Sequence, residues 1–199
     1  MTGAGEAGEL DDVQSRVPRQ PPSGQDALRP DDDARLSAEL AAAVAGARRR
    51  AVRDGDRQID TAHLLHALLE SAPEVRAVFD GGPQIARLLG YLVQRSIGYG
   101  LRWQSTVEDS GALPVVTEAD GFSPMAFAAL EYACERAARR GDEPARGLDL
   151  LAAIVVDPQA RAVEVLTRAA IDAGELAARL DNDAKDCPGE YAADGGPAY

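Results

Sequence analysis

The chain has 199 residues, of which 45% are hydrophobic but only 5% aromatic, and its formal net charge at pH 7 is -12. This acidic balance argues against the clustered Lys and Arg that bind phosphates, so a nucleic-acid-binding protein is not expected. No apolar run approaches the roughly 20 residues of a membrane span, and the Gly- and Glu-rich start lacks a signal-peptide pattern. We therefore expect a soluble, cytoplasmic protein with no nucleic-acid or membrane partner.

The two ends of the chain, residues 1–34 and 181–199, are rich in Gly, Pro and Asp and show no apolar periodicity. Such segments cannot bury enough apolar surface to offset the entropy lost on ordering, so both tails are predicted to be disordered. Solubility is the simplest consequence of their acidity, and a regulatory or tethering arm fits the same composition.

Between the tails, residues 35–180 contain an internal repeat with a period of 86 residues. The shift aligns several identities without a gap, among them Ser37 with Ser123, Ala43 with Ala129, Ala47 with Ala133, and Gly55-Asp56 with Gly141-Asp142. Self-similarity of this kind indicates tandem copies of one supersecondary unit. We place the first repeat at 35–97, a connection at 98–121 and the second repeat at 122–180.

Each repeat is predicted to contain four helices. The first begins after a capping serine, Ser37 or Ser123, runs for about 17 residues and ends near Gly55 or Gly141. A short second helix follows, from Thr61 as its N-cap to about Glu70, and from Leu148 to Val156. The remaining helices are predicted at 74–80 and 83–97, and at 159–170 and 173–180. The fold class is therefore all-α, with two tandem four-helix repeats.

The connection at 98–121 is long for a compact domain, and connections of this length are usually functional or mobile. It contains Trp103, the only tryptophan of the chain. Its acidic pair, Glu108 and Asp109, is expected to be solvated, as carboxylates in loops normally are.

Both histidines, His63 and His66, lie on the predicted second helix of the first repeat. A zinc site needs three or four ligands, and a metalloprotease motif needs a Glu directly after its first His, where this chain has Leu64. The leucines around the pair instead predict a core helix. We expect a structural His63 near the helix N-terminus, with no metal and no cofactor.

Catalytic motifs of other classes are missing from the sequence as well. It has neither a G-x-x-x-x-G-K-[ST] phosphate loop nor a G-x-S-x-G nucleophile elbow. We therefore expect a protein that is not an enzyme. A hydrolase dependent on His63 is the catalytic alternative.

Two motifs resemble the Clp N-terminal domain, or Clp repeat, family found at the front of the ClpA, ClpB and ClpC unfoldases. The first is Gly55-x-x-x-Ile59-x-Thr61-x-His63-Leu64-Leu65-x-Ala67-Leu68-Leu69. The second is Leu113-Pro114 with Phe122-Ser123-Pro124, which resembles the family's inter-repeat segment. The resemblance covers residues 35–180 and is weaker in the second repeat, where Gly147-Leu148-Asp149 replaces the motif. It implies two four-helix repeats in a pseudo-twofold relation, with His63 as a packing and capping residue.

The resemblance also implies a docking module for substrates, adaptor proteins and, in the ClpC branch, natural-product cyclic peptides. ClpC-type domains bind phosphorylated arginine through an acidic residue between Thr and His in each repeat. This chain has Ala62 and Leu148 there, so that activity is expected to be lost. The implied cyclic-peptide surface follows the first helices of both repeats and comprises Phe122, Phe127, Glu131, Val44 and Arg48. Phe122 fits either a ligand anchor or a hydrophobic staple for its own helix.

The ATPase modules of the unfoldases have no counterpart in this sequence, so the resemblance implies a stand-alone homologue that binds without unfolding. We expect it to modulate a Clp protease or to sequester ClpC-directed cyclic peptide antibiotics. Its expected partners are Clp protease components, adaptors, substrate peptides and cyclic peptide natural products. The alternative is a regulatory adaptor that acts through its acidic N-terminal arm or the loop between the repeats.

Overall fold

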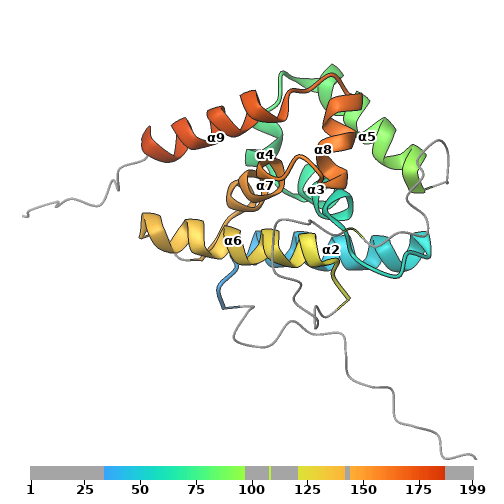
Figure 1. Ribbon diagram of the computed structural model, residues 1–199, viewed down its shortest axis with the longest axis horizontal. Coiled ribbons are helices and arrows are strands. Elements are labelled where there is room, and N and C mark those ends of the chain that lie inside the picture. The colour runs from blue at the N-terminus through green and yellow to red at the C-terminus, as the bar shows by residue number, and fades with distance from the viewer. Residues whose placement is uncertain (1–33, 97–107, 109–120, 142–143, 187–199) are drawn as a thin grey trace, which may run out of the picture.

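A computed structural model describes residues 34–96, 108, 121–141 and 144–186 (Figure 1). This part of the chain forms eight helices and no strand, which confirms the all-α fold class. The helices are α2 (Ala38–Asp54), α3 (Thr61–Ser71), α4 (Pro73–Ala77), α5 (Gly82–Ser96), α6 (Pro124–Arg140), α7 (Gly147–Val156), α8 (Arg161–Arg168) and α9 (Ala173–Asp186). None of the described helices is both long and apolar enough to cross a membrane. The predicted N-terminal tail, apart from residue 34, and the connection, apart from residues 108 and 121, lie outside the described residues.

The first helix of each repeat begins and ends as its sequence predicts. The side chains of Ser37 and Ser123 each accept the N–H of the third residue after them, at 3.1 Å in both cases. Gly55 and Gly141 follow the last helical residues with φ of 74° and 75°, a left-handed conformation in which a side chain would be strained. Starts at Ala38 and Pro124 preserve the 86-residue period.

The N-cap of α3 is Asp60, so the prediction of Thr61 is wrong by one residue. The Asp60 carboxylate accepts the N–H of His63 at 3.0 Å, and the N–H of Asp60 donates to Nδ1 of His63 at 3.1 Å. This reciprocal pair is a capping box in which histidine takes the place of the usual Glu or Gln. It confirms the capping role expected for His63. Thr61 becomes the first helical residue, and its hydroxyl bonds elsewhere.

Two isolated parallel bridges join the repeats. Leu36 pairs with Ala145, and Ile59 pairs with Phe122. The 86-residue shift maps Leu36 onto Phe122 and Ile59 onto Ala145, so each bridge is the image of the other under the repeat relation. Each is closed by the N-cap serine of its repeat, whose N–H donates to the opposite carbonyl at 2.8 Å. The two repeats therefore contact each other with the reciprocity of a twofold pair.

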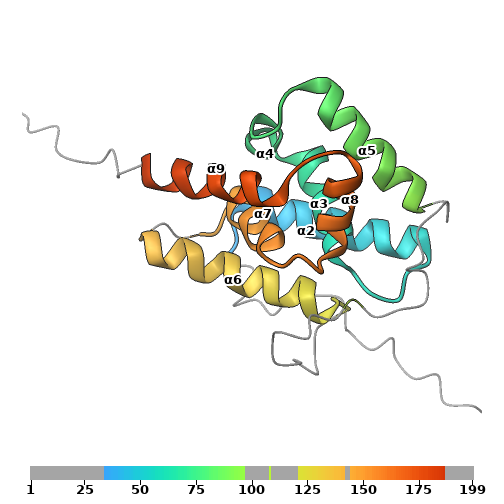
Figure 2. The same cartoon turned by 45° about the horizontal axis from the view of Figure 1, so that its top comes forward.

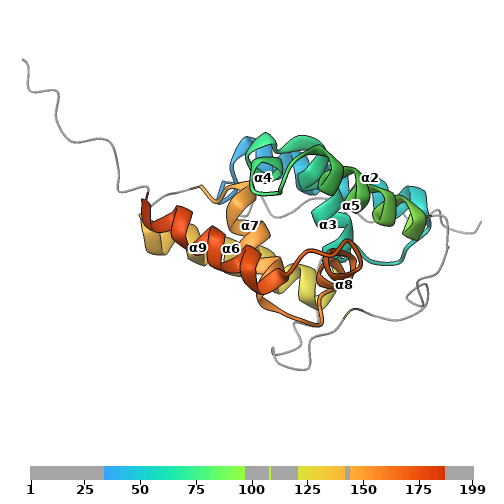
Figure 3. The ribbon, with the colours of Figure 1, turned by 90° about the horizontal axis from the view of Figure 1, so that it is seen from above.

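The helices form layers around α3 and α7. In Figure 1, α2 and α6 lie along one side, α5 and α9 along the opposite side, and α3 and α7 lie between them. Figure 2 and Figure 3 turn this arrangement and show α2 with α5 on one flank and α6 with α9 on the other. Contacts cross between the repeats where α3 meets α7 and α8, and where α4 meets α7. One apolar cluster runs through both repeats.

α8 is shorter than predicted, and α9 differs most from its predicted bounds. α8 spans only Arg161–Arg168, inside the predicted 159–170, and α9 continues to Asp186, past the predicted end at 180. Arg136 of α6 contacts α9 at the predicted end of that helix. Its guanidinium pairs with Asp181 at 2.7 Å and donates to the carbonyl of Leu180 at 2.9 Å. α9 is thereby tied to α6 beyond the last buried leucine, Leu180.

Candidate functional site

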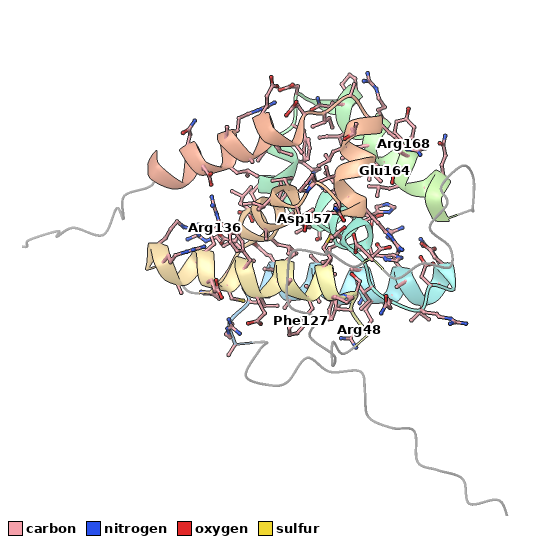
Figure 4. All side chains as sticks on the ribbon, in the orientation of Figure 1. Arg48, Phe127, Arg136, Asp157, Glu164 and Arg168 are labelled. Atoms are coloured by element: carbon pink, nitrogen blue, oxygen red, sulfur yellow. The ribbon has the colours of Figure 1, made fainter. Side chains whose placement is uncertain are left out.

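The five residues of the implied cyclic-peptide surface all come from α2, α6 and the residues that begin α6. We call the outer side of α2 and α6 the α2–α6 face; Figure 4 shows Arg48 and Phe127 there, on the side turned away from α3 and α7. Arg48, Phe127 and Glu131 are partly exposed on it, whereas Val44 and Phe122 are each only 1% exposed. The structure therefore divides the predicted set into partly exposed residues and a buried layer.

Phe122 lies beneath this face. The residue is held on one side by its bridge to Ile59, and the guanidinium of Arg48 lies 5.8 Å from the centroid of its ring. A cation over an aromatic ring is attracted by the ring quadrupole, so Arg48 helps to cover the ring from solvent. With 1% of its surface exposed, Phe122 is not open to a ligand in this structure.

Glu131 has a partner that sequence reasoning missed. Arg35, just before α2, places Nη1 3.2 Å and 3.4 Å from the two carboxylate oxygens. Both side chains are 43% exposed, so the pair contributes at most about 1 kcal/mol and can open at little cost for a ligand. The residues are 96 positions apart, and only the fold brings them together.

The two positions that would carry the phosphoarginine-binding acids hold apolar residues that are buried or partly buried. Ala62 is fully buried, and Leu148 is partly buried against the core. Neither side chain can pair with a guanidinium or a phosphate group. Loss of phosphoarginine binding therefore stays our prediction.

Three side chains in the described residues, Asp56, Asp60 and His63, bring potential metal-ligand atoms within 4.8 Å of one another. Their polar atoms already face protein groups. Asp60 caps His63 and pairs with Arg161 at 2.7 Å, and Nε2 of His63 lies 3.1 Å from a carboxylate oxygen of Asp56. Because Nδ1 of His63 accepts the Asp60 N–H, a neutral ring would carry its proton on Nε2, the nitrogen that lies near Asp56. These contacts describe a helix cap tied to α8.

In the second repeat Asp149 occupies the position equivalent to His63. Its carboxylate accepts the N–H of the N-cap residue, Arg146, at 3.0 Å. The same carboxylate receives a bidentate pair from Arg140 and lies 3.5 Å from Nε of Arg136. The cap is thus kept with different chemistry, an anion held by two arginines. This explains why the sequence motif is weak here although the helix begins at the matching residue.

The second histidine, His66, gives the domain a pH dependence. The residue is 3% exposed, and burial together with the charge of Arg50 lowers the pKa of His66 from 6.5 to about 4, against a smaller opposing effect of Glu70. His66 is therefore protonated below about pH 6.5 in the unfolded chain but only below about pH 4 in the folded chain. As a result, the folded state has its full stability above pH 6.5 and loses part of it as the pH falls toward 4.

We expect His66→Gln to remove this dependence. Between pH 7 and pH 4, the free energy of unfolding of the natural chain should fall by about 3 kcal/mol more than that of the variant. Urea denaturation followed by circular dichroism at both pH values measures the difference. Parallel pH profiles for the two proteins would contradict the assignment.

Glu108 was expected to be solvated, and this prediction is wrong. The residue is only 4% exposed, and its carboxylate accepts four hydrogen bonds from donors in both repeats. The N–H and hydroxyl of Thr61 belong to α3, the hydroxyl of Ser123 caps α6, and the N–H of Arg161 begins α8. These donors lie between 15 and 53 positions from Glu108 in the sequence, so no local sequence pattern predicts them.

No protein-family model and no curated protein matches the sequence. Among solved structures, the chain is similar to the N-terminal domain of the caseinolytic-protease-associated chaperone ClpD from Arabidopsis thaliana. That comparison has a TM-score of 0.52 and 17% identity, and it covers 76% of this chain and 95% of the other. A second similar chain comes from preliminary structural investigations of a malarial protein secretion system, with a TM-score of 0.56, 14% identity, and coverage of 77% and 97%. The chain therefore has a fold like that of a Clp N-terminal domain.

Proposed function

We propose that the protein is a non-enzymatic docking module that binds peptides or proteins on its α2–α6 face. The main support is the arrangement of that face, where a partly exposed aromatic side chain, Phe127, lies on the same side as Arg48 and the weakly paired Glu131. An aromatic anchor with a few polar neighbours is the pattern of a binding hot spot. The Clp N-terminal-domain-like fold supports the same role.

Four buried ionisable groups of the described residues also support binding over catalysis. Asp60, His63, Glu108 and Asp149 each take part in a helix cap, an ion pair or both. A general base or a nucleophile needs a proton or an electron pair directed at a substrate, and these groups direct theirs at the protein.

The ligands that we infer are those of the Clp system: protease components, adaptors, substrate peptides or ClpC-directed cyclic peptides. A docking domain can modulate a Clp protease or sequester a cyclic peptide antibiotic through affinity and abundance alone. Contact would be made by Phe127, Arg48 and Glu131, with Val44 and Phe122 supporting them from below.

Calorimetric titration with a ClpC-binding cyclic peptide tests this proposal. Phe127→Ala should weaken binding by about 30-fold, the effect of losing a hot spot of about 2 kcal/mol. Tyr132→Ala is the matched control, because this aromatic residue is exposed on the same helix, and it should change the affinity by less than about twofold. Free phosphoarginine should give no heat. Absence of binding by the natural chain, or equal losses in both variants, would contradict the proposed face.

The alternative, a regulatory adaptor that uses its acidic N-terminal arm or the loop between the repeats, concerns residues mostly outside the described part. Deleting residues 1–34 separates the two functions. Docking on the α2–α6 face should retain its affinity without the arm, whereas an adaptor that binds through the arm should lose its partner.

A further inference from the structure

The buried carboxylate of Glu108 joins three helix starts that belong to different repeats. Oε2 accepts the N–H of Thr61 at 2.9 Å and the hydroxyl of Ser123 at 2.8 Å. Oε1 accepts the N–H of Arg161 at 2.7 Å and the hydroxyl of Thr61. Hydrogen bonds to an ionised acceptor are stronger than neutral ones, and helix N-termini favour negative charge. One side chain therefore satisfies donors from α3, α6 and α8 at once.

In the second repeat, a different glutamate accepts the N–H of the residue that begins the equivalent helix. The 86-residue shift maps Thr61 onto Gly147, the first residue of α7. The N–H of Gly147 donates at 3.1 Å to a carboxylate oxygen of Glu74, the second residue of α4. A Cβ at Gly147 would lie 3.0 Å from that oxygen, so the glycine permits the close approach. Each repeat thus has its second helix capped by a glutamate from outside that helix.

The repeat relation explains why Glu108 is needed. The helix that corresponds to α4 is α8, and the 86-residue shift maps Glu74 onto Ala160, the N-cap residue of α8, which is buried and carries no carboxylate. From α8 itself, the N–H of Ala162 donates to the hydroxyl of Thr61, at 3.1 Å. A glutamate of α4 thus accepts the first N–H of α7, whereas α8 has no glutamate at the corresponding position that could accept the first N–H of α3. Glu108 supplies the missing carboxylate from the connection between the repeats.

We propose that Glu108 is a conformational anchor that fixes the starts of α3, α6 and α8 relative to one another across the boundary between the repeats. Without its carboxylate, two backbone N–H groups and two hydroxyl groups would lose their acceptor in a buried place. The boundary between the repeats is then held by Glu108 as well as by the apolar core. This anchor acts on α6, which carries Phe127, but the inference needs no ligand and stands independently of the docking function.

Amide hydrogen exchange measured by NMR tests the anchor. Glu108→Ala should accelerate exchange at both Thr61 and Arg161 by about tenfold or more and leave Gly147 nearly unchanged. Glu74→Ala is the matched control and should give the reverse pattern, with acceleration at Gly147 alone. Glu108→Gln keeps one acceptor oxygen and should therefore accelerate exchange strongly at only one of the two residues.

The pattern among the three amides decides the result. Acceleration of the same size at Thr61, Arg161 and Gly147 in Glu108→Ala would show a general loss of stability and would overturn the anchor. Unchanged exchange at Thr61 and Arg161 would overturn it too. If neither Glu108 variant folds, the natural chain supplies the test. The opening free energies of the Thr61 and Arg161 amides, obtained from their exchange rates, should then fall with denaturant concentration along one common line. Two different lines would refute the proposal.

Discussion

Asp149→Ala is expected to lower the free energy of unfolding by about 3–5 kcal/mol, a large part of the stability of an ordinary domain. The Asp149 side chain is 2% exposed and lies against the partly buried guanidinium groups of Arg140 and Arg136. Its removal takes a buried carboxylate away from Arg140, leaves Arg136 with the exposed carboxylate of Asp181, and removes the acceptor that Asp149 offers to the N–H of Arg146, the N-cap residue of α7. The dominant cost is the loss of this buried anion, which compensates the desolvation of the two partly buried guanidinium groups.

Urea unfolding at pH 7 measures this loss, and an exposed ion pair in the same repeat provides its control. Glu164 pairs with Arg168 at 2.8 Å one turn along α8, and their side chains are 40% and 43% exposed; Figure 4 labels both residues. Glu164→Ala should cost only about 0.5 kcal/mol or less, since water replaces the lost partner. A loss below about 1 kcal/mol for Asp149→Ala would show that solvent reaches the arginines and that the buried-pair account is wrong.

The sequence could predict the parts of this fold that depend on neighbouring residues. The helices α2 and α6 begin after Ser37 and Ser123 and end at Gly55 and Gly141 because capping is a local interaction, readable over a few positions. The repeat period predicted that the two halves would share a helix order. The resemblance to Clp N-terminal domains added the twofold relation, which the reciprocal bridges now display.

What the sequence could not predict depends on contacts between distant segments. Glu108 looks like any acidic residue in a polar connection, because its donors come from three separate helices. Arg35 and Glu131 meet across 96 positions, and Arg136 of α6 pairs with Asp181 of α9 across 45. Each of these contacts is an ion pair or a carboxylate cap between segments that only the fold brings together. Hydrophobic periodicity carries no information about such pairs.

The candidate site shows the same division. Its residues were predicted to share one surface, and the spacing of Phe127 and Glu131, one helical turn apart, fits a common side of α6. Burial could not be predicted, because whether Val44 and Phe122 face a ligand or the core depends on how the other repeat covers them. Arg48 also needed the fold, since its contact with the ring of Phe122 crosses from one repeat to the other.

Phe122→Ala is the substitution that separates an anchor for ligands from a staple for the fold. Phe122 is among the largest fully buried side chains, and it carries one of the two bridges between the repeats. We expect its removal to lower the free energy of unfolding by about 3–5 kcal/mol, the usual cost of deleting a buried aromatic ring. Phe122→Leu, which keeps most of the volume, should cost less than about 1.5 kcal/mol.

The two variants should therefore differ in stability and agree in ligand binding wherever both are folded. Urea unfolding gives the first quantity, and titration at a temperature well below the unfolding transition gives the second. Phe127→Ala should cost less stability than Phe122→Ala and should weaken binding, because its ring packs against the core but stays partly exposed. If Phe122→Ala stays as stable as the natural chain but loses its ligand, the ring must leave the core to meet that ligand. Arg48 would then be the residue that moves aside, and the buried layer of the α2–α6 face would be its true contact surface.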